Sequence, residues 1–178
     1  MAGMGRALIP VLACLAFAGC GNDRGSRAVP IFTLTSTGFR DGQPIAAQYS
    51  CDGANQSPAL AWGAPPQGTK SFALVVDDPD APGGTFYHWG SFDIPIGARA
   101  IPAGQIVGAQ AINDFGKTGY GGPCPPPGHG PHHYRFKLFA LDVPSLGLQP
   151  DVKIGKLERQ AEQHVVGRAE LSGTYKRR

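Results

Sequence analysis

The chain has 178 residues and a formal net charge of +3, with 42% hydrophobic and 16% charged residues. So small a positive excess does not favour a nucleic-acid-binding protein, and the length allows one domain with a sizeable core. The 26 glycines and 17 prolines separate short apolar runs, and no repeat of 20–50 residues is present, which excludes a solenoid.

Residues 1–19 have the composition of an export signal. Arg6 supplies a positive start, and the apolar stretch 7–18 is too short to span a bilayer. The segment ends in small residues directly before Cys20, and this arrangement resembles the bacterial lipobox. It implies that Cys20 is lipidated and becomes the new N-terminus.

The alternative is a plain secretory peptide that is cut near Ala18, because Phe17 departs from the usual Leu, Val or Ile of a lipobox. Gly21 is not the aspartate that retains lipoproteins at the inner membrane. By resemblance, we expect a lipoprotein of the outer membrane that faces the periplasm. Residues 20–29 are polar and glycine-rich, as in a flexible tether, and the folded domain is expected over 30–178.

Two of the four cysteines remain as free candidates. Cys14 leaves with the signal, and Cys20 is assigned to lipid. Since thiols of an exported protein usually pair in an oxidising compartment, Cys51 and Cys124 are predicted to form a disulfide. A metal-binding thiol pair is the competing interpretation, but the chain has no CxxC spacing to support it.

Four runs rich in β-branched and aromatic residues are predicted to be strands: 31–36, 71–78, 85–94 and 133–142. Turn clusters of glycine, proline, asparagine and aspartate separate them, which is the spacing of an all-β sandwich or barrel. The segment 151–166 has an apolar face that predicts a helix, and 167–177 alternates as a final strand. We therefore predict one β-sandwich with a late helix.

Polar residues that could form a site occur in three stretches: 75–82, 86–92 and 121–136. In the second stretch, strict strand alternation places His88 on one face, together with Phe86, Gly90 and Phe92. Trp89 would then lie on the opposite face.

In the third stretch, His132, Tyr134 and Phe136 share one face, and His133 lies on the other with Arg135. Prolines before this strand predict a rigid rim whose backbone amides suit an oxyanion. Acids from the first stretch are expected to hold His88 or His132 protonated. Together, these features predict a pocket for a small anion.

Five segments in this order resemble the phosphatidylethanolamine-binding protein family, in particular its bacterial Raf kinase inhibitor-like branch. They are "SPALAW", "GTKSFALVVDDPDAP", "YHWGSFDIP", "DFGKTGYGGPCPPPGHGPHHYRFKLFALD" and "AELSGTY". The resemblance runs from about Phe32 to Tyr175. It implies an antiparallel Greek-key β-sandwich, with a helix before the last strand, and a small pocket for phosphate or a phospholipid head group.

The resemblance also implies the ligand-binding residues, which are Asp78, Asp80, His88, Pro126, His132 and Tyr134. His133 stands where the family has an arginine, so any role of that arginine is in doubt. Cys51 and Cys124 resemble paired positions in exported members, in agreement with the predicted disulfide.

The predicted function is a lipid-anchored binding protein that takes a small anion and acts on a partner by binding, without a cofactor. The alternative is a hydrolase that acts on a phosphoester through the Asp/His pocket, although no catalytic residue is assigned. No GxSxG motif supports a serine hydrolase. A metal site of His88, His132 and an aspartate is a third possibility, but no HExxH motif is present, and no metal is expected.

Overall fold

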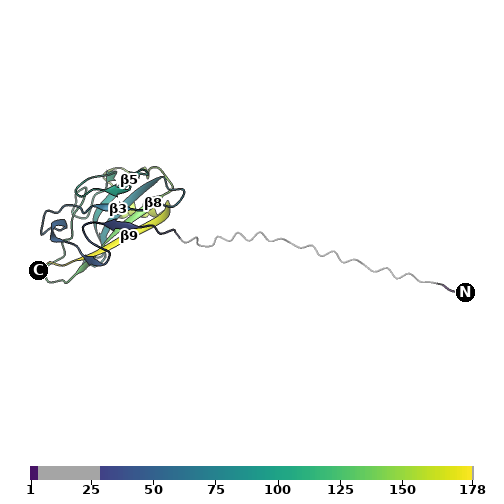
Figure 1. Cartoon of the computed structure of the whole chain (residues 1–178), viewed down its shortest axis with the longest axis horizontal. Helices are drawn as coiled ribbons and strands as arrows, with labels where there is room; N and C mark the ends of the chain where they lie inside the picture. Colours follow the sequence, from purple (N-terminus) through teal and green to yellow (C-terminus); the bar gives the residue numbers. More distant parts are fainter. Residues whose placement is uncertain (4–28, 178) are drawn as a thin grey trace.

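The computed structural model describes residues 1–3 and 29–177 (Figure 1). The predicted lipidation site Cys20 and most of the predicted signal and tether lie outside these residues. The strands are β1 (Leu34–Ser36), β2 (Gln43–Pro44), β3 (Leu60–Trp62), β4 (Ser71–Asp78), β5 (Phe86–Pro95), β6 (Ala100–Ile101), β7 (Ala109–Gln110), β8 (His132–Leu141) and β9 (Val165–Tyr175). A short 3-10 helix, η1 (Ala47–Tyr49), precedes β3, and the α-helix α1 (Ile154–Glu162) precedes β9.

The strands form two sheets. The smaller has the order β1-β3-β6, and the larger has the order β2-β9-β8-β4-β5-β7. All pairings between these strands are antiparallel except that of β2 with β9, which is parallel. The expected antiparallel Greek-key sandwich is therefore corrected to a mixed larger sheet beside an antiparallel smaller one. The parallel edge strand is only two residues long and contains Pro44, which has no N–H to donate and suits a sheet edge.

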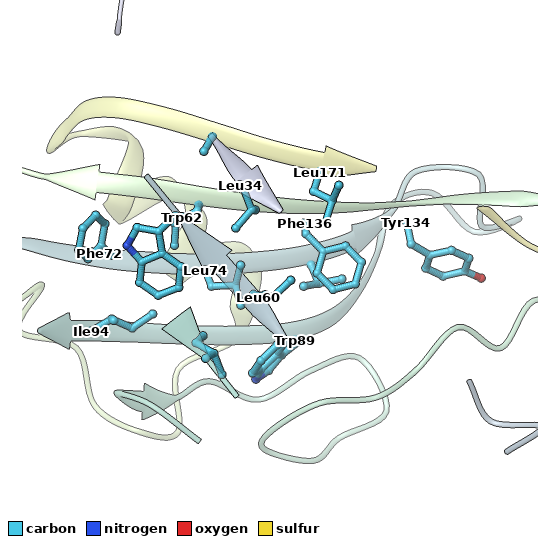
Figure 2. Packing of buried hydrophobic residues seen from close by; sticks show 14 of the residues in the cluster. Leu34, Leu60, Trp62, Phe72, Leu74, Trp89, Ile94, Tyr134, Phe136 and Leu171 are labelled. Carbon is cyan, nitrogen blue, oxygen red and sulfur yellow. The ribbon is translucent and has the colours of Figure 1, made fainter. Parts of the chain in front are cut away.

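The main core fills the space between the two sheets (Figure 2). Phe72, Leu74 and Val76 of β4 contribute to it from the larger sheet, while Leu60 and Trp62 come from β3. The rings of Trp62 and Phe72 meet edge to face, with their centroids 5.4 Å apart. The alternating residues of β4 thus bind the larger sheet to the smaller one.

The opposite face of the larger sheet packs against α1. Ala73 and Val75 of β4 lie in a second buried cluster with Leu157 and Ala161 of the helix. Because β4 is covered on both sides, all eight of its residues are buried, which explains its unbroken apolar run. No helix within residues 1–3 and 29–177 is long and apolar enough to cross a membrane.

The helix before the last strand is confirmed, but it is shorter than the predicted segment 151–166. Its N-cap is Lys153, and its C-cap is Gln163. Val165, which was expected on the apolar face of the helix, instead begins β9. The amide of His164 donates to the carbonyl of Ala161 at 3.0 Å and closes the turn between the two elements.

Candidate functional site

The sheet topology brings the three polar stretches to one end of the larger sheet. The strand β4 runs antiparallel to both of its neighbours, β5 and β8. The residue that ends β4, Asp78, therefore lies beside the residues that begin β5 and β8. Segments more than 50 residues apart in sequence meet there, as the Asp78–His132 contact shows.

A hollow of about 210 Å³ lies at this end of the sheet. It brings together four of the six predicted ligand-binding residues: Asp78, His88, Pro126 and His132. The other residues that line it are Ala81, Pro82, Phe86, Phe115, Cys124 and Pro125. It is thus an apolar recess that contains one carboxylate and two imidazoles.

Asp78 and His132 form a buried pair in the hollow. The Nδ1 of His132 lies 2.7 Å from Oδ2 of Asp78, and both side chains are only 4% exposed. The other carboxylate oxygen, Oδ1, accepts a hydrogen bond from the amide of Asp80 at 2.8 Å. This arrangement fixes the ring of His132 and leaves its Nε2 without a hydrogen bond to a described residue, so Nε2 can meet a ligand.

A β-bulge places His88 in the hollow. Val76 pairs with Trp89, but the next residue, Asp77, pairs with Tyr87, so that His88 is an extra residue in β5. The bulge puts His88 on the same side as Trp89, where its ring packs against Tyr134 with a centroid distance of 5.1 Å.

The prediction that His88 shares a face with Gly90 and Phe92, opposite Trp89, is therefore wrong. Phe92 belongs to the cluster on the helix side of the sheet, and a Cβ on Gly90 would meet Ile154 of α1 at 2.7 Å. Strict alternation fails here because the inserted residue shifts the pattern by one position.

The surroundings of His88 favour its neutral form, in contrast to the expectation that nearby acids would hold it protonated. Its Nδ1 lies 2.8 Å from the carbonyl oxygen of Gly121, which can only accept, so Nδ1 carries the hydrogen. Burial lowers the pKa of His88 and outweighs the hydrogen bond to Gly121 and the charge of Asp78, which act in the opposite direction. In the neutral ring, the Nε2 of His88 is thus a lone-pair acceptor.

Tyr134 lies behind the hollow and carries a buried hydroxyl. The residue is 0% exposed, and its hydroxyl makes no hydrogen bond of normal geometry within the described part of the chain, although Asp78 and the backbone of Cys124 lie near enough to act on its pKa. Figure 2 shows its oxygen directed away from the packed core side chains. Burial raises the pKa of Tyr134, and the negative charge of Asp78 adds to the rise, so the group is a neutral phenol that can donate. A buried polar group without a partner calls for an explanation, and a ligand would supply one.

Asp80 and His133 lie outside the hollow. Both side chains are exposed, at 42% and 59%, and they pair with each other. Oδ2 of Asp80 accepts from the backbone amide of His133 at 2.8 Å and lies 2.7 Å from its Nδ1. These hydrogen bonds lower the pKa of Asp80. The predicted separation of His133 from His132 is thus confirmed, and Asp80 braces the turn after β4.

A charged cluster supports the strands from the other face. Asp77 is 1% exposed and accepts two hydrogen bonds of 2.8 Å from Arg135 and one of 2.7 Å from Lys137. Lys137 also contacts Glu158 of α1. Adjacent aspartates therefore have separate roles: Asp78 serves the hollow, and Asp77 ties β4 to β8.

The predicted Cys51–Cys124 disulfide is confirmed, with an S–S distance of 2.07 Å. Cys124 lies on the proline-rich rim and lines the hollow. Two hydrogen bonds from backbone amides also join the rim to the segment around Cys51. The amide of Cys51 donates to the carbonyl of Pro123 at 3.1 Å, and the amide of Gly122 donates to the side-chain Oδ1 of Asn55 at 2.7 Å. The rim is thus fixed to the segment that follows η1.

Sequence analysis correctly placed Phe86 beside His88, whose ring centroid lies 5.1 Å away, but it did not name Phe86 as a wall of the hollow and it missed Phe115 altogether. The rings of Phe86 and Phe115 meet with centroids 4.8 Å apart, and Phe115 also meets His88 at 5.4 Å. The aromatic pattern of 86–92 was a signal for Phe86, but no local pattern distinguishes Phe115.

As for a metal centre, the described residues contain no group of three or more His, Cys, Asp or Glu side chains that could hold an ion.

Comparison with known proteins identifies the family of this chain. The family model described as phosphatidylethanolamine-binding protein matches residues 35–176. The chain belongs to the phosphatidylethanolamine-binding protein family. The resemblance inferred from the five ordered segments is therefore confirmed.

Two relatives and one solved structure are similar over most of the chain. A UPF0098 protein of Aquifex aeolicus is 46% identical over 153 residues, which are 83% of this chain and 90% of the relative. The Mycobacterium tuberculosis protein named "Putative lipoprotein LppC" is 44% identical over 145 residues, 80% of this chain and 71% of that one. The crystal structure of E. coli YbcL, which is described as a new member of the mammalian PEBP family, is also similar, with a TM-score of 0.79 and 33% sequence identity. The match covers 83% of this chain and 99% of the YbcL chain.

Proposed function

We propose that this family member binds a phosphate-type anion, free or as a phospho-head-group, in the hollow formed by Asp78, His88 and His132. The observation that carries the proposal is the buried hydroxyl of Tyr134, which makes no hydrogen bond of normal geometry with the described residues, although its ring packs against that of His88. A tetrahedral oxyanion would supply the missing acceptor. The name of the family, which refers to a phospholipid, supports the same class of ligand.

Each polar group has a distinct role in this proposal. His132 donates from Nε2 in its imidazolium form, while its Nδ1 lies 2.7 Å from the carboxylate of Asp78, which fixes the ring. The lowered pKa of His88 favours its neutral form, so its Nε2 accepts the proton of a protonated phosphate oxygen or takes up a proton when the anion binds. Apolar walls such as Phe86 exclude water and strengthen these charge-assisted hydrogen bonds.

Affinity for the anion is therefore expected to rise as the pH falls. A bound anion raises the pKa of His88 from its lowered value, so that binding is coupled to proton uptake. When one proton is taken up, the affinity changes by up to about tenfold per pH unit. Calorimetric titration with phosphate and with sulfate between pH 5.5 and 8 measures this dependence. Sulfate does not titrate in this range, so it isolates the contribution of the protein. Equal affinity at both ends of the range, or no binding at all, would contradict the proposal.

The pair of Asp78 and His132 also favours a second candidate, a hydrolase of phosphoesters. A carboxylate on Nδ1 orients an imidazole whose Nε2 can act as a general base. A panel of chromogenic phosphomonoesters and phosphodiesters separates the two functions. We expect no turnover above background. Turnover that is lost in His132→Ala and kept in His133→Ala, its exposed neighbour, would establish the hydrolase instead.

We further infer that Cys20 carries lipid and that the domain is displayed on the outer membrane, facing the periplasm, where the occupied hollow modulates a partner protein. The relative named as a lipoprotein supports the anchor, and a disulfide on the rim suits an oxidising compartment. Mass spectrometry of the mature N-terminus and fractionation of membranes test the anchor and its location.

A further inference from the structure

A second hollow lies next to the first. It has a volume of about 240 Å³, and its walls are Cys51, Asn55, Asn113, Phe115, Lys117, Thr118, Tyr120, Gly121 and Gly122. The two hollows share Phe115 as a wall. The carbonyl of Gly121, from the wall of the second hollow, receives the hydrogen bond of His88 in the first. A ligand that fills the first hollow thus has the second as its neighbour.

The side-chain amide oxygens of the second hollow already accept hydrogen bonds. Oδ1 of Asn113 accepts from the backbone amides of Phe115 and Lys117, both at 3.1 Å. Oδ1 of Asn55 accepts from the amide of Gly122 at 2.7 Å. No aspartate or glutamate lines this hollow, so no carboxylate in its walls repels an anion.

Three of its side-chain donors, in contrast, remain available. Nζ of Lys117, Nδ2 of Asn55 and the hydroxyl of Thr118 make no hydrogen bond or ion pair with the described residues, and the side chains of all three are exposed. The nearby carboxylate of Asp114 accepts from the amide of Tyr87 at 2.8 Å and does not line the hollow. The second hollow therefore combines a cation with neutral donors.

We propose that the second hollow is a subsite for a negatively charged substituent of the ligand, and that Lys117 determines this specificity. This inference rests on the proposed function: the phosphate occupies the first hollow, and its substituent passes Phe115 to reach Lys117. The ligand class is then a phosphorylated small molecule with a second anionic group, such as a phosphorylated carboxylic acid. A cationic substituent such as ethanolamine is disfavoured, because Lys117 repels it.

Matched ligands and matched variants test the subsite by calorimetry on the full chain. Glycerol 3-phosphate and 3-phosphoglycerate differ by a carboxylate, O-phosphoethanolamine carries an ammonium, and inorganic phosphate has no substituent. The variant is Lys117→Gln, and the control is Lys156→Gln, which removes an exposed lysine of α1, on the other side of the larger sheet.

The wild-type chain should bind 3-phosphoglycerate about two- to fivefold more tightly than glycerol 3-phosphate, as expected for one exposed ion pair, and O-phosphoethanolamine most weakly of the three. Lys117→Gln should abolish this order and leave the affinity for inorganic phosphate unchanged, while Lys156→Gln should change neither. Equal affinity for the three esters in the wild type, or the same order in Lys117→Gln, would overturn the subsite while the first hollow still binds phosphate. Absence of phosphate binding would overturn the proposed function itself.

Discussion

Replacing both cysteines, as Cys51→Ala with Cys124→Ala, is expected to lower the free energy of unfolding by about 2–5 kcal/mol. The bond joins positions 73 residues apart, so its loss gives the unfolded chain much more conformational freedom. Urea denaturation of the wild type and of the double variant measures the difference. A reducing agent should destabilise the wild type by a similar amount and leave the double variant unchanged. A difference below about 1 kcal/mol would contradict this prediction.

The same variant should keep its fold, but the rim of the first hollow should be held less firmly. Hydrogen bonds from Cys51 N to Pro123 and from Gly122 to Asn55 do not depend on the sulfur atoms. The rim therefore stays near its position, but it is less firmly held. We expect weaker phosphate binding in the double variant, because Cys124 lines the hollow.

The substitution Tyr134→Phe is expected to affect stability and binding in opposite ways. Removing a buried hydroxyl without a partner should leave the free energy of unfolding unchanged or raise it by up to about 1 kcal/mol. Phosphate affinity should fall by about tenfold or more, since a hydrogen bond to a charged group contributes about 1.5–3 kcal/mol. Chemical denaturation and calorimetry on the same preparation measure both quantities.

Tyr87→Phe is the matched control. The hydroxyl of Tyr87 donates to Oε2 of Glu158 at 2.7 Å, on the helix side of the sheet. Its removal should lower stability and leave phosphate affinity unchanged. If Tyr134→Phe instead destabilised the fold with no loss of affinity, the phenol would have a structural partner and no contact with the anion.

The sequence predicted those parts of the site that depend on regular alternation. The pattern of β8 placed His132 and Tyr134 on one face and His133 on the other, and the structure confirms this because β8 pairs with β9 without interruption from His132 to Ala140. The disulfide was predictable for a different reason, since the number of free thiols and the expected compartment left one pair.

The remaining features depend on tertiary contacts that no local pattern encodes. The bulge at His88 arises where β5 pairs with β4, and it reversed the predicted face. The protonation state of His88 depends on how deeply it is buried. Asp80 has the same sequence signal as Asp78, but its partner is the exposed His133. The parallel pairing of β2 with β9 is likewise a tertiary contact, because it joins Gln43 and Pro44 to Gly173 and Thr174, which are far away in the sequence.

A crystal structure of the protein with inorganic phosphate tests the central claim most directly. We predict the anion in the first hollow, with its oxygens within hydrogen-bonding distance of Nε2 of His88, Nε2 of His132 and the hydroxyl of Tyr134. Phosphate bound only elsewhere, for example beside the exposed Lys176, with these three groups still unpaired or in contact with water alone, would contradict the account.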